Sequence, residues 1–412
     1  MDSRLLHAAL TFALVSAVFL AGCEEPPAPA NESGWSPAGV SAVAEANNQL
    51  ALDLYARLSG EEGNVFFSPY SLSSALALTY EGARGQTAEE MQSVLHVPAD
   101  ESVRRVNYAR IYNVINRPSA LYTLSTANAL WAQQDYLFLQ EYVGVAREYY
   151  GANVSNMDFV GDSEGSRQTI NGWVEAQTND KIKDLIPPGI LDQYTRLVLT
   201  NAIYFKGTWV KQFDEGDTRE EDFTTGSGAK VEVMMMRLTG EEAKFNYGVT
   251  EDVQLLELPY DGGNLSMLVI LPKQRSGLTE VEVSLTPEKL SEWRKTLRER
   301  RVDVYLPRFK YETKYLMADT LSGMGMPTAF TPAADFSGMD GTTDLYIQQV
   351  IHQAFVEVNE ECTEAAAATA IVMTLGASMS DVFRADHPFI FLIQEKETGA
   401  ILFMGRVDNP AG

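Results

Sequence analysis

The sequence is poor in the residues from which catalytic and metal sites are usually built. It contains two cysteines and four histidines in 412 residues, and it has no CxxC, HExxH, P-loop or GxGxxG pattern. No metal, nucleotide or other cofactor site is therefore predicted. Two cysteines allow at most one disulfide, which excludes a small scaffold held together by several disulfides.

Positive charge is also scarce. Lysine and arginine total 32 against 56 aspartate and glutamate residues, so the formal net charge is −24. A surface this acidic repels phosphate backbones, and we expect no nucleic-acid partner. The one basic run, RKTLRERR at 294–301, is interpreted as a solvated helix face, with a polyanion site as the alternative.

The N-terminus has the features of an export signal. Residues 8–22 are apolar except for Thr11 and Ser16, a stretch too short to span a bilayer but suited to a signal peptide. Its end, LAGC, resembles the bacterial lipobox, in which the cysteine is lipidated. We therefore expect a signal peptide over 1–22 and lipidation of Cys23, with an ordinary secretory signal as the alternative. The expected location is the cell envelope, where the exported protein is held on a membrane by its lipid.

Residues 23–37 are polar and proline-rich, and we expect a disordered tether there. Beyond the tether, residues 38–412 show no break in composition and are expected to form one large domain. Apolar residues at helical spacing after Val40 predict a first helix. Ser68-Pro69 predicts the start of another helix, and Thr87 with Glu90 has the pattern of a capping box for the next.

Strands dominate the later part of the sequence. Residues 121–133 and 195–210 are rich in β-branched and aromatic residues, and two hairpins are predicted with turns at Asp261-Gly262 and near Gly399. Helical patterns come mostly first and strands mostly last, which favours an α+β fold over alternating α/β units.

The segment 356–373, VEVNEECTEAAAATAIVM, combines residues that favour strand with residues that favour helix. Val356 and Val358 alternate as in a strand, but four alanines follow at 365–368. Alanine favours helix over strand, so the segment is either a plain helix or a stretch with two possible states. The next residues, 374–381 (TLGASMSD), are small and polar, and would suit binding in a protease active site.

These features closely resemble the serpin family. VNEECTEAAAATA resembles the serpin hinge that leads into the reactive-centre loop. Four further stretches match in the family's order and cover nearly all of the mature chain: 64–91, 170–189, 199–214 and 385–410. The resemblance implies the serpin fold, with a helical N-terminal part, three β-sheets and an exposed reactive-centre loop.

The resemblance also implies an inhibitor that is not an enzyme. A serine protease, or possibly a cysteine protease, cleaves the loop and is held as an acyl-enzyme while the freed segment inserts into the main sheet. Counting along the loop places the reactive bond between Gly376 and Ala377, with Leu375 as the alternative. Gly-Ala would suit elastase-like or subtilisin-like proteases, and Leu375 chymotrypsin-like ones. We expect a monomer and no cofactor.

Individual residues carry over from the family pattern. The expected shutter, beneath the strands that open, contains Ser68, Ser71, Asn201 and His352. Phe205, Trp209 and Arg308 complete the expected shutter and breach region, and Phe205 and Trp209 are expected to pack at the top of these strands. His352 is also compatible with a satisfied core histidine, and Arg308 is the expected partner of Glu360. The expected hinge consists of Glu360, Glu361, Cys362, Thr363, Glu364, Ala365, Ala366, Ala367, Ala368 and Thr369.

Two features leave other functions open. Cys362 stands where the family pattern has glycine, so a Cβ could slow insertion. A tolerated small residue and a redox-sensitive hinge are both possible, and a non-inhibitory serpin acting as a binding protein or protease substrate is the alternative function. Residues 161–165 (GDSEG) fit a nucleophile-elbow pattern, but no apolar strand precedes them. A hydrolase is therefore disfavoured.

Overall fold

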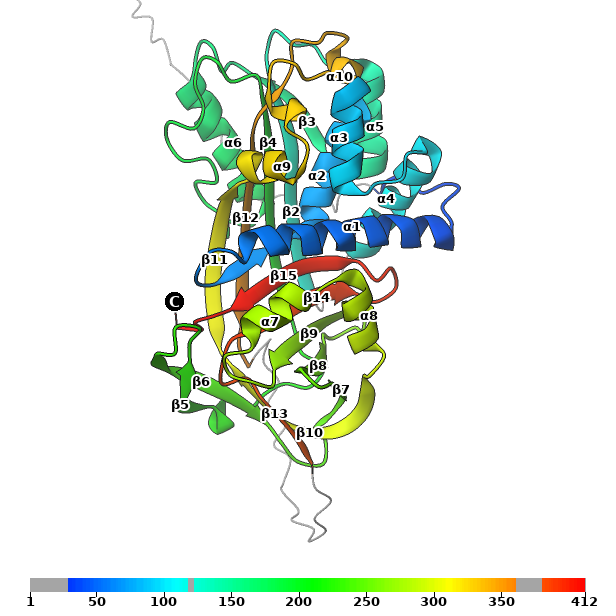
Figure 1. The fold of residues 1–412 in the computed structure, drawn as a ribbon. Helices are drawn as coiled ribbons and strands as arrows, with labels where there is room; N and C mark the ends of the chain where they lie inside the picture. Colours follow the sequence, from blue (N-terminus) through cyan, green and yellow to red (C-terminus); the bar gives the residue numbers. More distant parts are fainter. Residues whose placement is uncertain (1–28, 118–121, 361–379, 412) are drawn as a thin grey trace, which may run out of the picture.

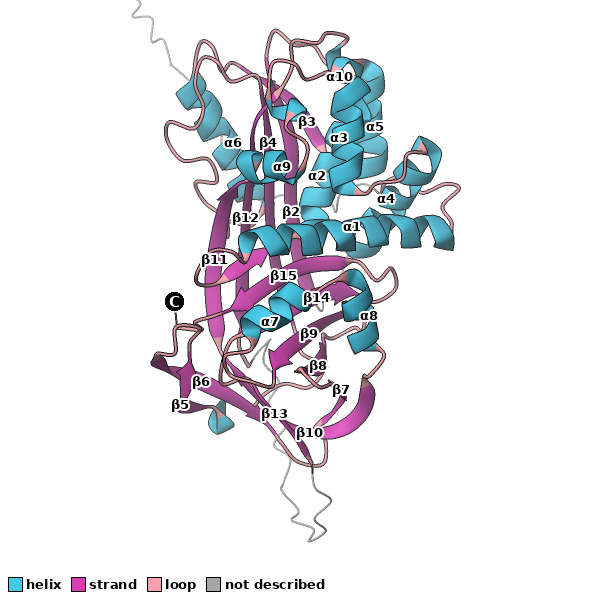
Figure 2. Cartoon of the chain, in the orientation of Figure 1, coloured by secondary structure: helices cyan, strands magenta, loops and turns pink. Residues whose placement is uncertain are grey.

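A computed structural model describes residues 29–117, 122–360 and 380–411. Most of the helices gather at one end of the molecule and most strands at the other, where α7 and α8 also lie, while a long sheet runs between the two ends (Figure 1). The α+β expectation is confirmed, because most helices come before most strands along the chain and the two do not alternate regularly (Figure 2). Within these ranges, no helix is both long enough and apolar enough to cross a bilayer.

The helices vary from one turn to six turns. Their bounds are α1 Pro37–Leu58, α2 Pro69–Gly82, α3 Gly85–Leu95, α4 Glu101–Ile115, α5 Gln140–Tyr150, α6 Ser163–Gln177, α7 Leu278–Ser284, α8 Pro287–Arg294, α9 Ala318–Met324 and α10 Ser337–Asp340, with short 3₁₀ turns at Glu215–Asp217 and Thr328–Phe330.

The strands include both hairpins expected from the sequence, β8–β9 and β14–β15. Their bounds are β1 Val65–Phe67, β2 Tyr122–Gln133, β3 Asn153–Met157, β4 Leu197–Gly207, β5 Arg219–Thr224, β6 Lys230–Leu238, β7 Lys244–Val249, β8 Val253–Pro259, β9 Leu265–Pro272, β10 Arg298–Pro307, β11 Phe309–Leu316, β12 Ile347–Val358, β13 Asp381–Arg384, β14 Phe389–Glu395 and β15 Ile401–Val407.

Among the described residues, five strands form the long sheet in the order β11-β12-β4-β2-β3. The other ten form a path β1-β15-β14-β9-β8-β7-β10-β6-β5, with β13 paired to β10. Strand β10 joins two parts of this path, because Arg298–Arg301 pair with β7 whereas Val304–Pro307 pair with β6. The three sheets expected from the sequence are obtained when the path is divided at β10.

Of the two helix starts predicted from capping patterns, at Ser68-Pro69 and at Thr87, only the first is confirmed. Ser68 caps α2 by accepting the backbone N–H of Ser71 (3.2 Å), and Pro69 is its first residue, as the sequence predicted. The capping box at Thr87 was wrong, because α3 begins at Gly85 and Thr87 lies inside it. Tertiary partners use both side chains instead: Thr87 accepts the N–H of Asp335 (2.9 Å), and Glu90 binds Thr328.

The two faces of the five-stranded sheet have different covers. On one face, α2 packs between this sheet and β15. On the other face, α6 buries Ile170 and Val174 in a separate apolar cluster, where Trp173 meets Trp131 of β2 edge to face at 5.3 Å. Because side chains alternate along a strand, β2, β4 and β12 each contribute residues to this cluster and to the main core on the opposite face.

Residues 29–36, which the sequence assigned to a disordered tether, are docked on α4 and α5. Asn113 of α4 accepts the N–H of Ala30 (2.8 Å) and donates to its carbonyl (2.9 Å). The guanidinium of Arg110 binds Glu32 and lies 4.6 Å from the ring centroid of Trp35. These partners come from residues about eighty positions away, which explains why local composition did not predict the docking.

Candidate functional site

Strands β12 and β4 lie side by side at the centre of the five-stranded sheet. They run parallel and pair from Ile347 with Leu197 to Phe355 with Tyr204. Both strands continue for three more residues, but there β12 pairs with β11 and β4 pairs with β2. Within the described residues, the central pairing therefore stops before the two strands end.

A buried polar cluster bridges the middle of this pairing. His352 of β12 and Asn201 of β4 are directly opposite each other, and Nδ1 of His352 bonds Oδ1 of Asn201. The backbone N–H of Ser68 donates to Nε2 of His352 (3.0 Å). Since Nε2 accepts, the proton of the ring is on Nδ1, and His352 donates to Asn201.

Asn201 continues the cluster toward α2 and β2. Its amide nitrogen donates to Ser71 Oγ (2.6 Å) and to Asn128 Oδ1 (2.7 Å), and Ser71 donates to the same oxygen of Asn128 (2.8 Å). The structure thus brings together the four expected shutter residues and adds Asn128 of β2. The sequence gave no signal for Asn128, because its place depends on the β2–β4 register.

The environment keeps His352 neutral. Its side chain has no exposed surface, and this burial lowers the pKa of His352 from 6.5 to about 3, against a smaller opposing effect of Asn201. A neutral ring can accept from Ser68 and donate to Asn201 at once, whereas a protonated ring would lose the first bond. The cluster therefore requires the uncharged form.

Trp209 lies beside the point where β12 and β4 cease to pair. Its indole N–H donates to the carbonyl oxygen of Asn359 (3.0 Å), just beyond the end of β12. The indole is stacked on Tyr260 with centroids 4.4 Å apart, and Phe205 meets the same ring edge to face at 5.0 Å. Trp209 and Phe205 thus lie beside the end of the β12–β4 pairing, the end that leads into the expected loop.

Glu360 is the last described residue before the expected loop. Its carboxylate is buried, with a fractional exposure of 1%, and it accepts hydrogen bonds from Arg308 and from the hydroxyl of Thr218. Arg308, which follows β10, also lies 3.8 Å from Glu215. The expected partnership of Glu360 and Arg308 is present, and Thr218 was not expected.

The chain re-enters the described structure at Ser380, whose hydroxyl donates to Asp303 (2.5 Å). Strand β13 follows at once and pairs in parallel with β10. The remaining hinge residues 361–369, the reactive bond at 375–377, and Cys23 lie outside the described residues. The 19 residues 361–379 connect a buried, ion-paired glutamate on one side to a hydrogen-bonded strand on the other.

The GDSEG segment has a structural role. Asp162 caps the N-terminus of α6 by accepting the N–H of Gly165 (2.8 Å), and Ser163 is the first residue of that helix. The described histidines bind elsewhere: His96 to Asp53, His352 in the cluster above, and His387 between Asp386 and the carbonyl of Pro272. None of their hydrogen bonds within the described residues involves Ser163.

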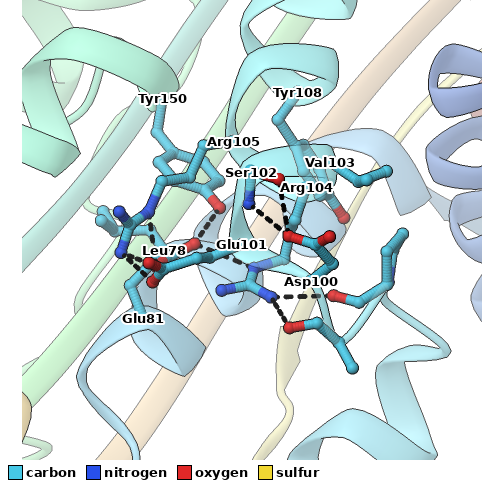
Figure 3. Close-up of polar contacts among 12 residues, drawn as sticks. Leu78, Glu81, Asp100, Glu101, Ser102, Val103, Arg104, Arg105, Tyr108 and Tyr150 are labelled. Atoms are coloured by element: carbon cyan, nitrogen blue, oxygen red, sulfur yellow. Dashed lines mark hydrogen bonds and ion pairs between the residues drawn. The ribbon is translucent and has the colours of Figure 1, made fainter. Parts of the chain in front are cut away.

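A buried cluster of charged residues holds α2, α4 and α5 together (Figure 3). The carboxylate of Glu81 is bound by Arg104 (2.9 Å), Arg105 (2.8 Å) and the hydroxyl of Tyr150 (2.8 Å). Burial would raise the pKa of Glu81, but the hydrogen bonds and charges of the two arginines outweigh it and lower that pKa below its usual 4.5. Because α2 also contacts β2 and β4, the cluster links α4 and α5 to the five-stranded sheet.

Comparison with known proteins identifies the family to which this fold belongs. Residues 45–410 match the family described as Serpin (serine protease inhibitor). The chain is 44% identical to a serpin-like protein of Thermococcus kodakarensis, covering 89% of this chain and 86% of that one. It is 42% identical to the human leukocyte elastase inhibitor, covering 89% and 99%.

Solved structures of similar proteins have the same fold. Uncleaved ovalbumin superposes with a TM-score of 0.82 at 33% identity, covering 90% of this chain and all of that one. Human thyroxine-binding globulin gives a TM-score of 0.80 at 29% identity, covering 90% and 99%. The fold is the serpin fold of mixed helices and sheets in one domain, and the chain belongs to the serpin family.

Proposed function

We propose that this protein inhibits serine proteases as a suicide substrate. The observation that carries the proposal is the junction of β12 and β4, which are hydrogen-bonded to each other up to Phe355 and Tyr204 and part beyond. The loop segment follows directly from β12. A cleaved segment folding back would therefore run antiparallel to β12, and antiparallel to β4 as well.

Such an insertion would replace one parallel ladder by two antiparallel ladders, which are somewhat more stable per residue. Within the shutter cluster, it would break the contact between His352 and Asn201, the contact that joins β12 directly to β4. The bond from Ser68 to His352 joins α2 to β12 and could persist. The small residues at 365–368 would meet little steric resistance between the two strands.

A protease panel tests this function. The purified domain is incubated with elastase-like, subtilisin-like and chymotrypsin-like proteases, and covalent complexes are sought on denaturing gels. We expect a complex that survives denaturation with at least one of them, and loop cleavage at Gly376–Ala377 or after Leu375. Cleavage by every protease without any complex would favour the alternative below.

The alternative is a non-inhibitory serpin that acts as a binding protein or protease substrate. Cys362, at a position where the family pattern has glycine, favours it, and so does the similarity to thyroxine-binding globulin, whose solved structure is a complex with a ligand. The Cys362→Gly variant separates the two. If cysteine hinders insertion, glycine should reduce the number of inhibitor molecules consumed per protease trapped.

We also propose that the protein is exported and anchored to a membrane of the cell envelope through a lipid on Cys23. The lipobox-like LAGC sequence supports this location. Residues 24–28 would then connect the lipidated cysteine to residues 29–36, which dock on α4 and α5. Labelled palmitate should enter the full-length protein and not Cys23→Ala. An unlabelled wild-type protein in the medium would contradict the anchor.

A further inference from the structure

The last paired residues of β12 and β4 are both aromatic. Phe355 and Tyr204 lie directly opposite each other, with ring centroids 5.7 Å apart and planes at 44°. Both project from the α6 side of the sheet, because Ala202 and Ile351, two and four residues away, belong to the cluster under α6. This ring pair is therefore separate from the polar cluster, which lies on the opposite face.

A lysine lies over each ring. The ammonium of Lys310, on β11, is 5.5 Å from the centroid of Phe355 and 3.5 Å from the carboxylate of Glu357. The ammonium of Lys181, in the segment after α6, is 5.7 Å from the centroid of Tyr204. These distances are typical of cation–π contacts. The row Lys181–Tyr204–Phe355–Lys310 thus extends across the boundary between β4 and β12.

The ring pair is incompatible with a strand between β12 and β4. Neighbouring strands are about 4.8 Å apart, so an inserted strand would move these two to about 9.6 Å. Aromatic pairs interact at centroid separations of about 4.5–7 Å, and the rings at 5.7 Å would lose contact. The alanines at 365–368 have no ring with which to replace it.

We propose that Tyr204 and Phe355 form a latch that sets the rate at which the central sheet opens, and that Lys310 and Lys181 position the two rings. This proposal rests on the insertion mechanism proposed above. Phe355 and Tyr204 are the first paired residues that a segment entering from the end of β12 would meet. The latch would hold the uncleaved protein in its five-stranded form and delay insertion after cleavage.

The rate of peptide insertion tests the latch without a protease. A synthetic peptide with the sequence of residues 363–376 is added to the uncleaved protein, and its incorporation is followed by native gel and by the rise in melting temperature. We expect Phe355→Leu and Tyr204→Leu to incorporate it about fivefold faster than wild type, because one aromatic contact no longer has to break. Phe355→Tyr keeps the ring and should restore the wild-type rate.

Phe138→Leu is the matched control for general destabilisation. Phe138 is also half-buried and pairs with Tyr142, at 5.8 Å, but this pair lies at the start of α5, away from the central strands. For the positioning lysines, Lys289→Gln controls Lys310→Gln, because Lys289 lies 5.9 Å from the ring of Trp293 and 3.4 Å from Glu292. Lys310→Gln should accelerate incorporation, and Lys289→Gln should not.

The outcomes are distinct. Acceleration in Phe355→Leu but not in Phe138→Leu supports the latch. Equal rates in wild type and Phe355→Leu, or equal acceleration in Phe138→Leu, overturn it. Failure of the wild-type protein to incorporate any peptide overturns the insertion mechanism itself and would be seen before any variant is compared.

Discussion

Arg308 and Glu360 form an ion pair at the point where β12 passes into the loop segment. The side chain of Glu360 has 1% of its surface exposed, whereas that of Arg308 has 37%. The buried partner is therefore the last described residue before the segment that the proposed mechanism moves. Through this pair and the Trp209–Asn359 hydrogen bond, the end of β12 is tied to the chain after β10 and to the chain after β4.

Arg308→Met should destabilise the uncleaved protein. The substitution leaves the carboxylate of Glu360 buried with the hydroxyl of Thr218 as a partner, and removing one member of a buried pair is costly. Because Arg308 is partly exposed, solvent screens the pair, and we expect a loss of about 2 kcal/mol. Denaturant unfolding monitored by fluorescence measures it.

Arg300→Met is the control for Arg308→Met. Arg300 pairs with Asp381 at 3.5 Å, but both side chains are more than 40% exposed. Exposed pairs contribute little, so its unfolding midpoint should stay close to that of wild type. Equal losses in the two variants would show that the Arg308–Glu360 pair has no special role.

His352 should make the protein sensitive to mild acid. Its pKa is about 3 in the folded state and 6.5 when unfolded, so between these values the unfolded chain binds one more proton. The contribution of neutral His352 to the free energy of unfolding is fully present above pH 6.5. It decreases as pH drops toward 3, by about 1.4 kcal/mol per pH unit at most. Unfolding midpoints at pH 7.5, 6 and 5 measure the slope. His352→Gln should flatten it, and an unchanged slope in that variant would contradict the assignment.

Glu81 should make the free energy of unfolding depend on pH in a lower range than His352 does. Its folded pKa lies below the usual 4.5, so its contribution is complete above about pH 5 and is lost as pH falls through the folded pKa. Glu81→Gln leaves Arg104 buried without its counter-charge, and we expect a loss of about 3 kcal/mol at pH 7. The difference from wild type should shrink at pH 3. Glu164→Gln, on the surface of α6, should leave the unfolding midpoint unchanged.

Local sequence was sufficient for some of these features and not for others. The start of α2 at Ser68-Pro69 and both hairpin turns depend on neighbouring residues, and the sequence predicted them. The capping box at Thr87 failed because Asp335 and Thr328, about 240 residues later, use its side chains. Asn128 and the Tyr204–Phe355 pair depend on strand register, which depends on the whole sheet.

Thr363→Arg tests the first step of insertion. The family resemblance makes Thr363 the first side chain to enter the core as the segment inserts, and an unpaired buried charge costs several kcal/mol. We expect the loop to be cleaved at the wild-type rate while covalent complex with the protease disappears. Glu364→Arg, one residue later and therefore on the other face, is the matched control. A Thr363→Arg protein that traps protease as efficiently as wild type would contradict the hinge assignment.

In the proposed mechanism, the cleaved segment becomes a strand between β12 and β4. A thermal melt before and after a single cleavage near Gly376, by a protease that is not trapped, tests this directly. We expect a large rise in melting temperature, because one parallel ladder is replaced by two antiparallel ones. A melting temperature that is unchanged or lower after cleavage would mean that the segment does not insert, and would contradict the proposed mechanism.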